Sequence, residues 1–156
     1  MTEISLVEVP EMNVLGTKKT GTYTLIPELL MKVFTHIQKK KGVIAGPPLF
    51  ICHETSPEAV AEANGKGTAE IEVVWPVAKP VTGTKGITAY VLPGGRMAHA
   101  VHKGPYETCE STYLALFAWI AEKDLTICGP IREAYPNDPR VVSPEDIITE
   151  IYAPVR

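Results

Sequence analysis

Two short segments near the end of the chain each place a glutamate two residues before a tyrosine. They are Glu133 with Tyr135 and Glu150 with Tyr152. A carboxylate beside aromatic rings suits a lipophilic cation, because the rings offer apolar area and a negative π-face while the carboxylate supplies the counter-charge. The pattern therefore indicates a ligand site, although glutamates on a solvated sheet face show the same spacing.

An internal repeat supplies the elements that position these residues. A shift of 83 residues places 4–48 on 87–131, and a shift of 78 places 71–77 on 149–155. The sequence thus predicts a single domain over 1–156 that holds two copies of one unit. The copies are repeat 1 over 4–77 and repeat 2 over 87–155. The first copy is five residues longer within 53–68, a stretch that is expected to be a solvated loop.

Each copy is predicted to run strand, turn, strand, helix, strand, strand. Residues 4–9 and 87–92 are first strands that stop at a proline, and 14–19 and 97–102 are the strands that return beside them. A helix follows, with apolar residues at i, i+3, i+4, i+7, i+8 and i+11. The two stripes are Ile26, Leu29, Leu30, Val33, Phe34 and Ile37, and Cys109, Thr112, Tyr113, Leu116, Phe117 and Ile120. The basic run before Gly42 indicates the end of the first helix, where cations suit the dipole and glycine closes the cap.

These elements predict the α+β class, a duplicated β-β-α-β-β unit with pseudo-two-fold symmetry and antiparallel sheet. Two main helices are expected on one face, and a ligand cleft between the repeats on the other. Because Ile151 and its repeat mate Val73 are apolar, their face is assigned to the helices, and Glu150 points the other way. Glu133 shares a face with Tyr135, and repeat symmetry places Phe50 at the position of Glu133. The predicted ligand-binding residues are Glu133, Tyr135, Glu150, Tyr152, Phe50, Glu72, Tyr113 and Trp119.

Composition excludes several classes of function. The net charge is −3 and the pI about 5.8, which argues against direct nucleic-acid binding, since that needs a clustered basic surface. No segment approaches the length of a membrane span, and no leader peptide is recognisable, so a cytoplasmic protein without membrane contact is expected. The three cysteines have no zinc spacing, and neither a metal nor a cofactor is expected.

Two pieces of the last segment carry a family resemblance. They are 133–139, Glu-Ala-Tyr-Pro-Asn-Asp-Pro, and 149–155, Thr-Glu-Ile-Tyr-Ala-Pro-Val. With the duplicated unit, they resemble the GyrI-like small-molecule-binding domains, which form the effector-binding half of AraC- and MerR-type multidrug regulators. The resemblance covers nearly the whole chain and implies a pocket glutamate at Glu133, with a second acidic position and its aromatic neighbour at Glu150 and Tyr152. The sequence shows no DNA-binding helical segment, so a stand-alone form is expected.

The leading interpretation is multidrug or xenobiotic binding, for sequestration, sensing or resistance, with bulky, lipophilic, cationic aromatic molecules as ligands. The alternative is a hydrolase that opens strained rings of toxic cyclopropane-bearing compounds, with Glu133 or Glu150 as general base. The resemblance also leaves open a protein partner, such as a regulator or gyrase, and a haem bound through His99 or His102. These two histidines lie three apart in one strand and are therefore expected on opposite faces.

Overall fold

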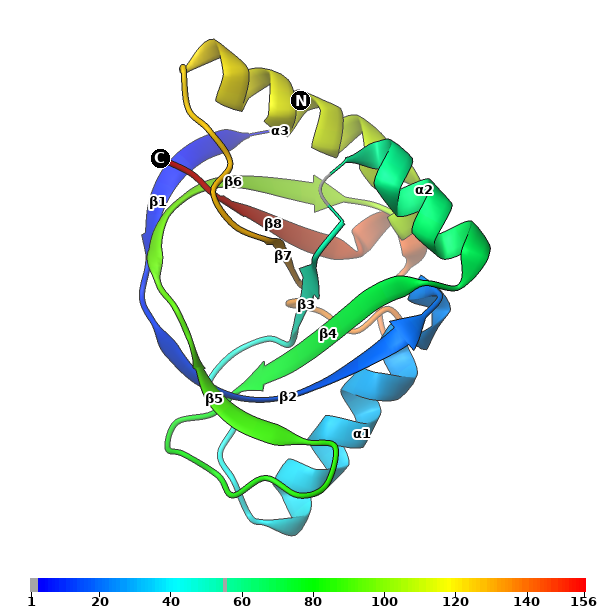
Figure 1. The fold of residues 1–156 in the computed structure, drawn as a ribbon, viewed down its shortest axis with the longest axis vertical. Helices are drawn as coiled ribbons and strands as arrows, with labels where there is room; N and C mark the ends of the chain where they lie inside the picture. Colours follow the sequence, from blue (N-terminus) through cyan, green and yellow to red (C-terminus); the bar gives the residue numbers. More distant parts are fainter. Residues whose placement is uncertain (1–2, 55) are drawn as a thin grey trace. The chain divides into compact units, whose positions relative to one another are not determined.

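A computed structural model describes residues 3–54 and 56–156, and Figure 1 traces its elements. The predicted order of elements and the α+β class are confirmed. The strands are β1 (Ile4–Val9), β2 (Met12–Gly21), β3 (Leu49–Cys52), β4 (Ala69–Pro76), β5 (Thr88–Leu92), β6 (Gly95–Lys103), β7 (Ile131–Ala134) and β8 (Ile148–Pro154). The helices are α1 (Ile26–Lys39), α2 (Pro57–Lys66) and α3 (Cys109–Glu122), and short 3-10 turns cover Tyr23–Leu25, Tyr106–Thr108 and Pro144–Asp146. None of the helices in the described part of the chain has the length and apolar composition that a membrane crossing needs.

The chain divides into two compact units, and the first contains β1 together with the segment Gly94–Arg156. We refer to it as the α3 unit. Its strands pair antiparallel in the order β1, β6, β8, β7, and Figure 1 shows β1 running beside β6. The helix α3 packs against β6 and buries a stripe of its own residues that includes Leu116 and Ile120. On the sheet, Ala100 and Ile151 pair with each other and are fully buried.

The second unit spans Glu11–Pro93, and we refer to it as the α1 unit. Its strands pair antiparallel in the order β3, β4, β2, β5. The helix α1 packs on β4 and β2 and buries Leu29, Val33 and Ile37 from the predicted stripe. Trp75 of β4 fastens the helix to the sheet, because its indole Nε1 donates a hydrogen bond to the Leu30 carbonyl at 2.9 Å.

The first strand of each repeat pairs inside the unit that contains the other repeat's helix. β1 pairs with β6, and β5 pairs with β2, so the prediction that 14–19 and 97–102 return beside their own first strands is wrong. Two residues join each first strand to the next, Pro10-Glu11 and Pro93-Gly94. Two-residue hairpins favour turns with positive φ at the first central residue, and proline fixes φ near −65° there. Each link therefore carries the chain into the other unit instead of turning it back.

The stretch 53–68 contains the helix α2, where the sequence predicted a solvated loop. Ser56 caps the helix, since its hydroxyl accepts a hydrogen bond from the Ala59 amide at 3.1 Å. Pro57 opens the first turn, and Gly67 ends the helix with a left-handed φ of 67°. Serine, proline and glycine at these positions are strong helix boundaries, and the alanine and glutamate between them favour a helix.

The helices α1 and α3 end with the same backbone geometry. Lys41 and Asp124 adopt left-handed φ values of 57° and 56°, and the next amides bond back to the Ile37 and Ile120 carbonyls at 2.9 and 3.0 Å. The predicted cap at Gly42 is therefore one residue too late. In both copies a residue with a side chain takes a conformation that glycine adopts at lower cost.

Gly16 provides a test of the packing in the α1 unit, because β2 passes there between β4 and β5. A Cβ at Gly16 would come within 2.6 Å of the Tyr90 hydroxyl oxygen and 2.8 Å of the Val73 carbonyl oxygen. Gly16→Ala is expected to lower the free energy of unfolding by about 1–3 kcal/mol, measured by urea denaturation, because the neighbouring backbone cannot move aside.

Gly65→Ala is the matched control, since a Cβ at Gly65 of α2 would meet nothing within 4 Å. Alanine favours a helix over glycine by about 0.5–1 kcal/mol, so this variant should be as stable as the wild type or slightly more so. Equal destabilisation of both variants would contradict the packing argument.

Candidate functional site

Glu133 lies at the centre of a cluster of three tyrosines in the α3 unit. In the ladder, Glu133 pairs with Ile151, so its side chain shares the face that α3 covers. Tyr113 of α3 donates a hydrogen bond to Oε2 of Glu133, and Tyr135 donates to Oε1 at 3.0 Å. The ring of Tyr106 meets that of Tyr135 edge-on, with centroids 5.8 Å apart. We call Glu133, Tyr113, Tyr135 and Tyr106 the tyrosine cluster.

The tyrosine cluster is half-buried and reaches the surface. Glu133, Tyr113 and Tyr135 are partly shielded from solvent, whereas Tyr106 is 41% exposed. The Tyr106 ring is therefore the member of the cluster that solvent reaches most.

The surroundings set the protonation of the cluster. Burial raises the pKa of Glu133, and the hydroxyl donors Tyr113 and Tyr135, followed by the nearby His102, act in the opposite direction. Burial and the Glu133 carboxylate raise the pKa of Tyr135 well above its usual value, so this tyrosine remains a hydrogen-bond donor at neutral pH. Burial likewise raises the pKa of the neighbouring Cys109 thiol to about 12, which keeps it neutral. The Tyr135 hydroxyl and the Cys109 thiol therefore stay neutral, which leaves the Glu133 carboxyl, with its raised pKa, as the acidic group among them.

The first repeat shows that the fold does not require these polar groups. Glu133, Tyr113 and Tyr135 correspond, by the repeat shift, to three apolar positions of the α1 unit. They are Phe50, Leu30 and Cys52, in the same order. Phe50 is 3% exposed and faces α1, because it pairs with Val73 in the ladder. Since the same backbone positions are filled by apolar side chains in the sister unit, the carboxylate of the second repeat indicates a site and not a structural need.

Glu150 and Tyr152 lie on the opposite face of the same sheet. They alternate along β8 with the buried Thr149, Ile151 and Ala153, as the sequence predicted. Oε1 of Glu150 lies 3.2 Å from Nε2 of His99, within hydrogen-bond distance. The His99 ring stacks on the Tyr152 ring, with centroids 4.5 Å apart. The interpretation of both Glu-x-Tyr pairs as one constellation is therefore wrong. Alternation within each strand was assigned correctly, but the offset between β7 and β8 places Glu133 beside Ile151.

Glu72 forms a third carboxylate cluster, in the α1 unit. It is only 5% exposed, on the sheet face away from α1. Its Oε2 accepts a hydrogen bond from the Tyr90 hydroxyl, and its Oε1 lies 2.7 Å from Nε2 of His53. The space that Gly16 leaves open admits the Tyr90 hydroxyl, whereas the corresponding position of the second repeat carries His99. Both units thus pair the equivalent glutamates, Glu72 and Glu150, with a different aromatic donor.

Phe50 and Trp119 do not join the carboxylates in the way the sequence predicted. Phe50 fills the core under α1, and its ring meets that of Tyr23 edge-on at 5.8 Å. Trp119 is half-buried on α3, and its ring is covered by the Lys123 ammonium, 5.7 Å from the centroid. Phe50 is thus part of the core of the α1 unit, and Trp119 lies beside Lys123, in none of the three carboxylate clusters.

Sequence reasoning missed Tyr106, His99, His53 and Tyr90 as members of these clusters. The signal for Tyr106 was present, because Gly104-Pro105-Tyr106 repeats Gly21-Thr22-Tyr23. His99 and His102 were correctly expected on opposite faces, since they pair with Tyr152 and Thr149. His102 is buried and bonded within its unit, its Nδ1 lying 2.8 Å from the Thr112 hydroxyl. Within residues 3–54 and 56–156, no three His, Cys, Asp or Glu side chains are arranged to hold a metal ion.

The family description "GyrI-like small molecule binding domain" matches residues 2–156. No curated protein sequence matches the chain. Among solved structures, the C-terminal domain of EcmrR superposes with a TM-score of 0.88 at 18% identity, over 100% of this chain and 98% of that one. EcmrR in the EcmrR–DNA complex of EcmrR-RPo gives a TM-score of 0.86 at 18% identity over 99% of this chain, which spans 57% of that longer protein.

Two further structures share the fold. A hydrolase encoded by lin2189 from Listeria innocua has a TM-score of 0.68 and 17% identity, over 99% of this chain and 92% of that one. SAV2435 bound to tetraphenylphosphonium has a TM-score of 0.61 and 13% identity, over 99% and 94%. At sequence identities this low, the superpositions establish a shared fold alone.

The raised pKa of Glu133 predicts how the stability depends on pH. Above the ordinary value of 4.5, the unfolded chain releases this proton before the folded chain does, so the free energy of unfolding falls as the pH rises. Glu133→Gln removes this effect, and the stability of the variant relative to wild type should increase from pH 4.5 to pH 8. Urea denaturation across that range measures it.

Tyr113→Phe provides the opposing variant. It removes a donor that lowers the pKa of Glu133, so its stability should fall more steeply with pH than that of the wild type. Parallel curves for the wild type and both variants would show that Glu133 does not titrate differently in the folded state.

Proposed function

Because the chain belongs to the family of GyrI-like small-molecule binding domains, we propose that its tyrosine cluster binds bulky, lipophilic, cationic aromatic molecules. The observation that carries the proposal is the carboxylate of Glu133, held by two tyrosine hydroxyls where the first repeat has Phe50. SAV2435, which shares the fold, has been crystallised with the lipophilic cation tetraphenylphosphonium. In this chain such binding serves sensing or sequestration of xenobiotics.

The cluster supplies both parts of the recognition. The rings of Tyr106 and Tyr135 offer faces and edges for aromatic groups, and Glu133 offers the counter-charge. A bound cation favours the ionised carboxylate, which burial alone disfavours, so binding is coupled to release of a proton. Burying roughly 400 Å² of apolar ligand surface at ~25 cal/mol/Å² contributes about 10 kcal/mol, and an association cost of about 4 kcal/mol leaves about 6 kcal/mol, a dissociation constant of tens of micromolar before the charge contributes.

Removal of the charge provides the direct test. Glu133→Gln should weaken tetraphenylphosphonium about tenfold, measured by isothermal titration calorimetry, and should change the binding of neutral triphenylphosphine oxide less than twofold. A tenfold loss corresponds to about 1.4 kcal/mol, a modest value for a partly shielded charge pair.

Glu150→Gln is the matched control for this experiment. Glu150 is a glutamate of the same sheet on the opposite face, so its loss should leave tetraphenylphosphonium binding unchanged. Equal losses in both variants, or equal losses for cation and neutral ligand in Glu133→Gln, would count against the tyrosine cluster as the cation site.

A second candidate function is hydrolysis of strained electrophilic rings, with Glu133 as general base on water. It is favoured by the raised pKa of Glu133, which brings a carboxylate closer to the basicity that proton abstraction requires. The lin2189 protein of the same fold is described as a hydrolase. A spirocyclopropyl-cyclohexadienone, whose ring opening is followed by absorbance, should be consumed by wild type and about 100-fold more slowly by Glu133→Gln. Consumption at the uncatalysed rate in the presence of wild type would remove this candidate.

A further inference from the structure

Lysines and glutamates are segregated within the α1 unit. The unit holds nine lysines and seven glutamates, a net charge of +2, whereas the α3 unit has six basic and eleven acidic residues, a net charge of −5. Six of the nine lysines lie in 29–53 and 77–92, which contain no aspartate or glutamate. They are Lys32, Lys39, Lys40, Lys41, Lys79 and Lys85. An acidic protein thus carries one local concentration of positive charge.

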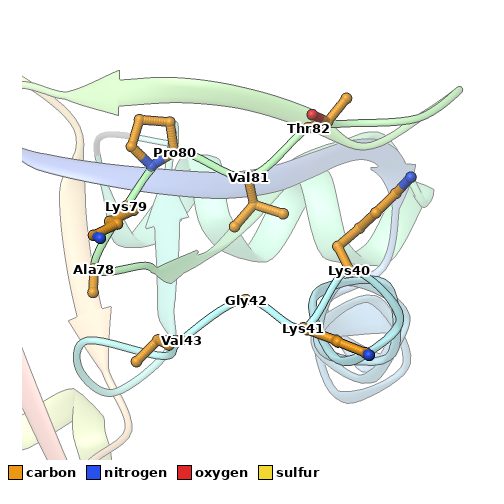
Figure 2. Close-up of a pocket in the computed structure, with 9 residues that line it drawn as sticks. All are labelled: Lys40, Lys41, Gly42, Val43, Ala78, Lys79, Pro80, Val81 and Thr82. Atoms are coloured by element: carbon orange, nitrogen blue, oxygen red, sulfur yellow. The ribbon is translucent and has the colours of Figure 1, made fainter.

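A pocket of about 390 Å³ opens within this basic region. Figure 2 shows its two walls, 40–43 after the helix α1 and 78–82 after the strand β4. Lys40, Lys41 and Lys79 belong to the lining, and no acidic residue does. Between the lysines the lining is apolar or small, and the Val81 side chain points from one wall toward the other at Gly42. A volume of this size is within the range of small-molecule pockets.

Hydrogen bonds hold the two walls in place. The Ala78 amide donates to the Val43 carbonyl at 2.9 Å, and the Ala45 amide donates to the Pro76 carbonyl at 2.9 Å. At the end of the second wall, Nε2 of the buried His36 of α1 lies 2.9 Å from the carbonyl oxygen of Thr82. The pocket is therefore formed in advance, and a ligand would not need to order its walls.

The three lining lysines have no counter-charge in the described part of the chain. None of them takes part in an ion pair there, and all three are exposed. Because the lining carries positive charge and no carboxylate, the potential at the pocket favours a bound anion.

The end of the helix α1 does not require lysine at positions 39 and 41, although Lys40 has a lysine, Lys123, as its repeat mate. In the second repeat α3 ends with the same hydrogen bonds and the same φ, but Glu122 and Asp124 stand at the positions of Lys39 and Lys41. The backbone geometry thus tolerates either sign of charge, and the basic run of the first repeat has a different cause.

We propose that this pocket binds a small organic anion, a carboxylate-, sulfonate- or phosphate-bearing molecule whose apolar body rests on Val43 and Val81. Lys40 and Lys41 from one wall and Lys79 from the other supply the counter-charges. Val43 is 64% exposed, so an apolar group that covers it is removed from water as well. The site lies within the α1 unit and is proposed to bind anions, whereas the tyrosine cluster is proposed to bind cations. The anion site therefore does not depend on the function proposed above.

The probe for this site is 1-anilinonaphthalene-8-sulfonate, an aromatic anion whose fluorescence rises on binding. It should bind wild type saturably with one high-affinity site in low salt, and raising the salt should weaken it. Lys40→Gln/Lys79→Gln, with one change in each wall, should raise the dissociation constant at least tenfold. Val43→Glu, at an exposed position, should do the same by placing a negative charge at the pocket.

Lys66→Gln/Lys103→Gln is the control with the same change in net charge. Both lysines are 67% exposed and pair with Glu62 and Asp146 on the surface, where ion pairs contribute little to stability. This variant should bind the probe within twofold of wild type. The neutral analogue N-phenyl-1-naphthylamine should not distinguish the two double variants, and both should retain the tetraphenylphosphonium binding of wild type.

Three results would overturn the anion site. One is the absence of saturable probe binding, and another is equal weakening in the pocket variant and its control. The third is binding of a hexaglutamate peptide, sensitive to Lys40→Gln/Lys79→Gln, without binding of the small anion, which would identify an acidic protein segment as the occupant.

Discussion

The hydrogen-bonded ladder in which β8 runs between β6 and β7 sets the faces on which Glu133, His99 and Glu150 lie in the α3 unit. Ile151 and Ala153 have no exposed surface, and their burial against the α3 side fixes which face of β8 turns inward. A shift of one residue would turn these apolar groups to the solvent side and bring Glu150 and Tyr152 to the face that α3 covers. The register therefore separates Glu133 from Glu150, and with them two clusters of different chemistry. The ladder of β4 with β2 does the same for Glu72 in the α1 unit.

The two repeats serve as controls for each other, because they share a backbone plan and differ in chemistry. Phe50 fills a position where the second repeat carries Glu133, and Gly16 leaves open a position where it carries His99. At the ends of the main helices, Lys41 corresponds to Asp124 with the same left-handed φ. In each pair one copy shows what the fold needs, and the difference from the other copy points to function. By this comparison the α3 unit has exchanged apolar packing for a carboxylate, and the α1 unit has concentrated lysine around a pocket.

The sequence predicted the elements well and their pairing poorly. Periodicity found α1, α3 and the alternation of β8, because each of these depends on neighbours a few residues apart. The same local information put Tyr113, Tyr135 and Glu133 among the predicted site residues, which the structure brings together, and correctly read Trp75 as packing. It failed where partners are distant in the chain.

The exchange of β1 and β5 illustrates that failure. It brings Tyr90 to Glu72 across β2, and no spacing within either repeat contains that contact. The offset between β7 and β8, which parts Glu133 from Glu150, is likewise a property of two strands together and not of either one. The third error, the prediction of a loop where α2 lies, had a local cause. Ser56, Pro57 and Gly67 are helix boundary residues, but the segment was assigned to a loop from its composition.

The pairing of β1 with β6 also sets the order in which the protein is completed as it is synthesised. The strand β1 leaves the ribosome before the α1 unit, but its partner begins at Gly95, after the whole of Glu11–Pro93. That contiguous segment contains all four strands and both helices of the α1 unit, so this half is complete in the nascent chain while β1 still has no partner. During that interval Leu6, Val7 and Val9 form an unpaired, largely apolar strand, in which Glu8 is the charge that opposes pairing with other nascent chains. The strand β1 is thus made before the α1 unit and finds its partner in β6 only after that unit has been made.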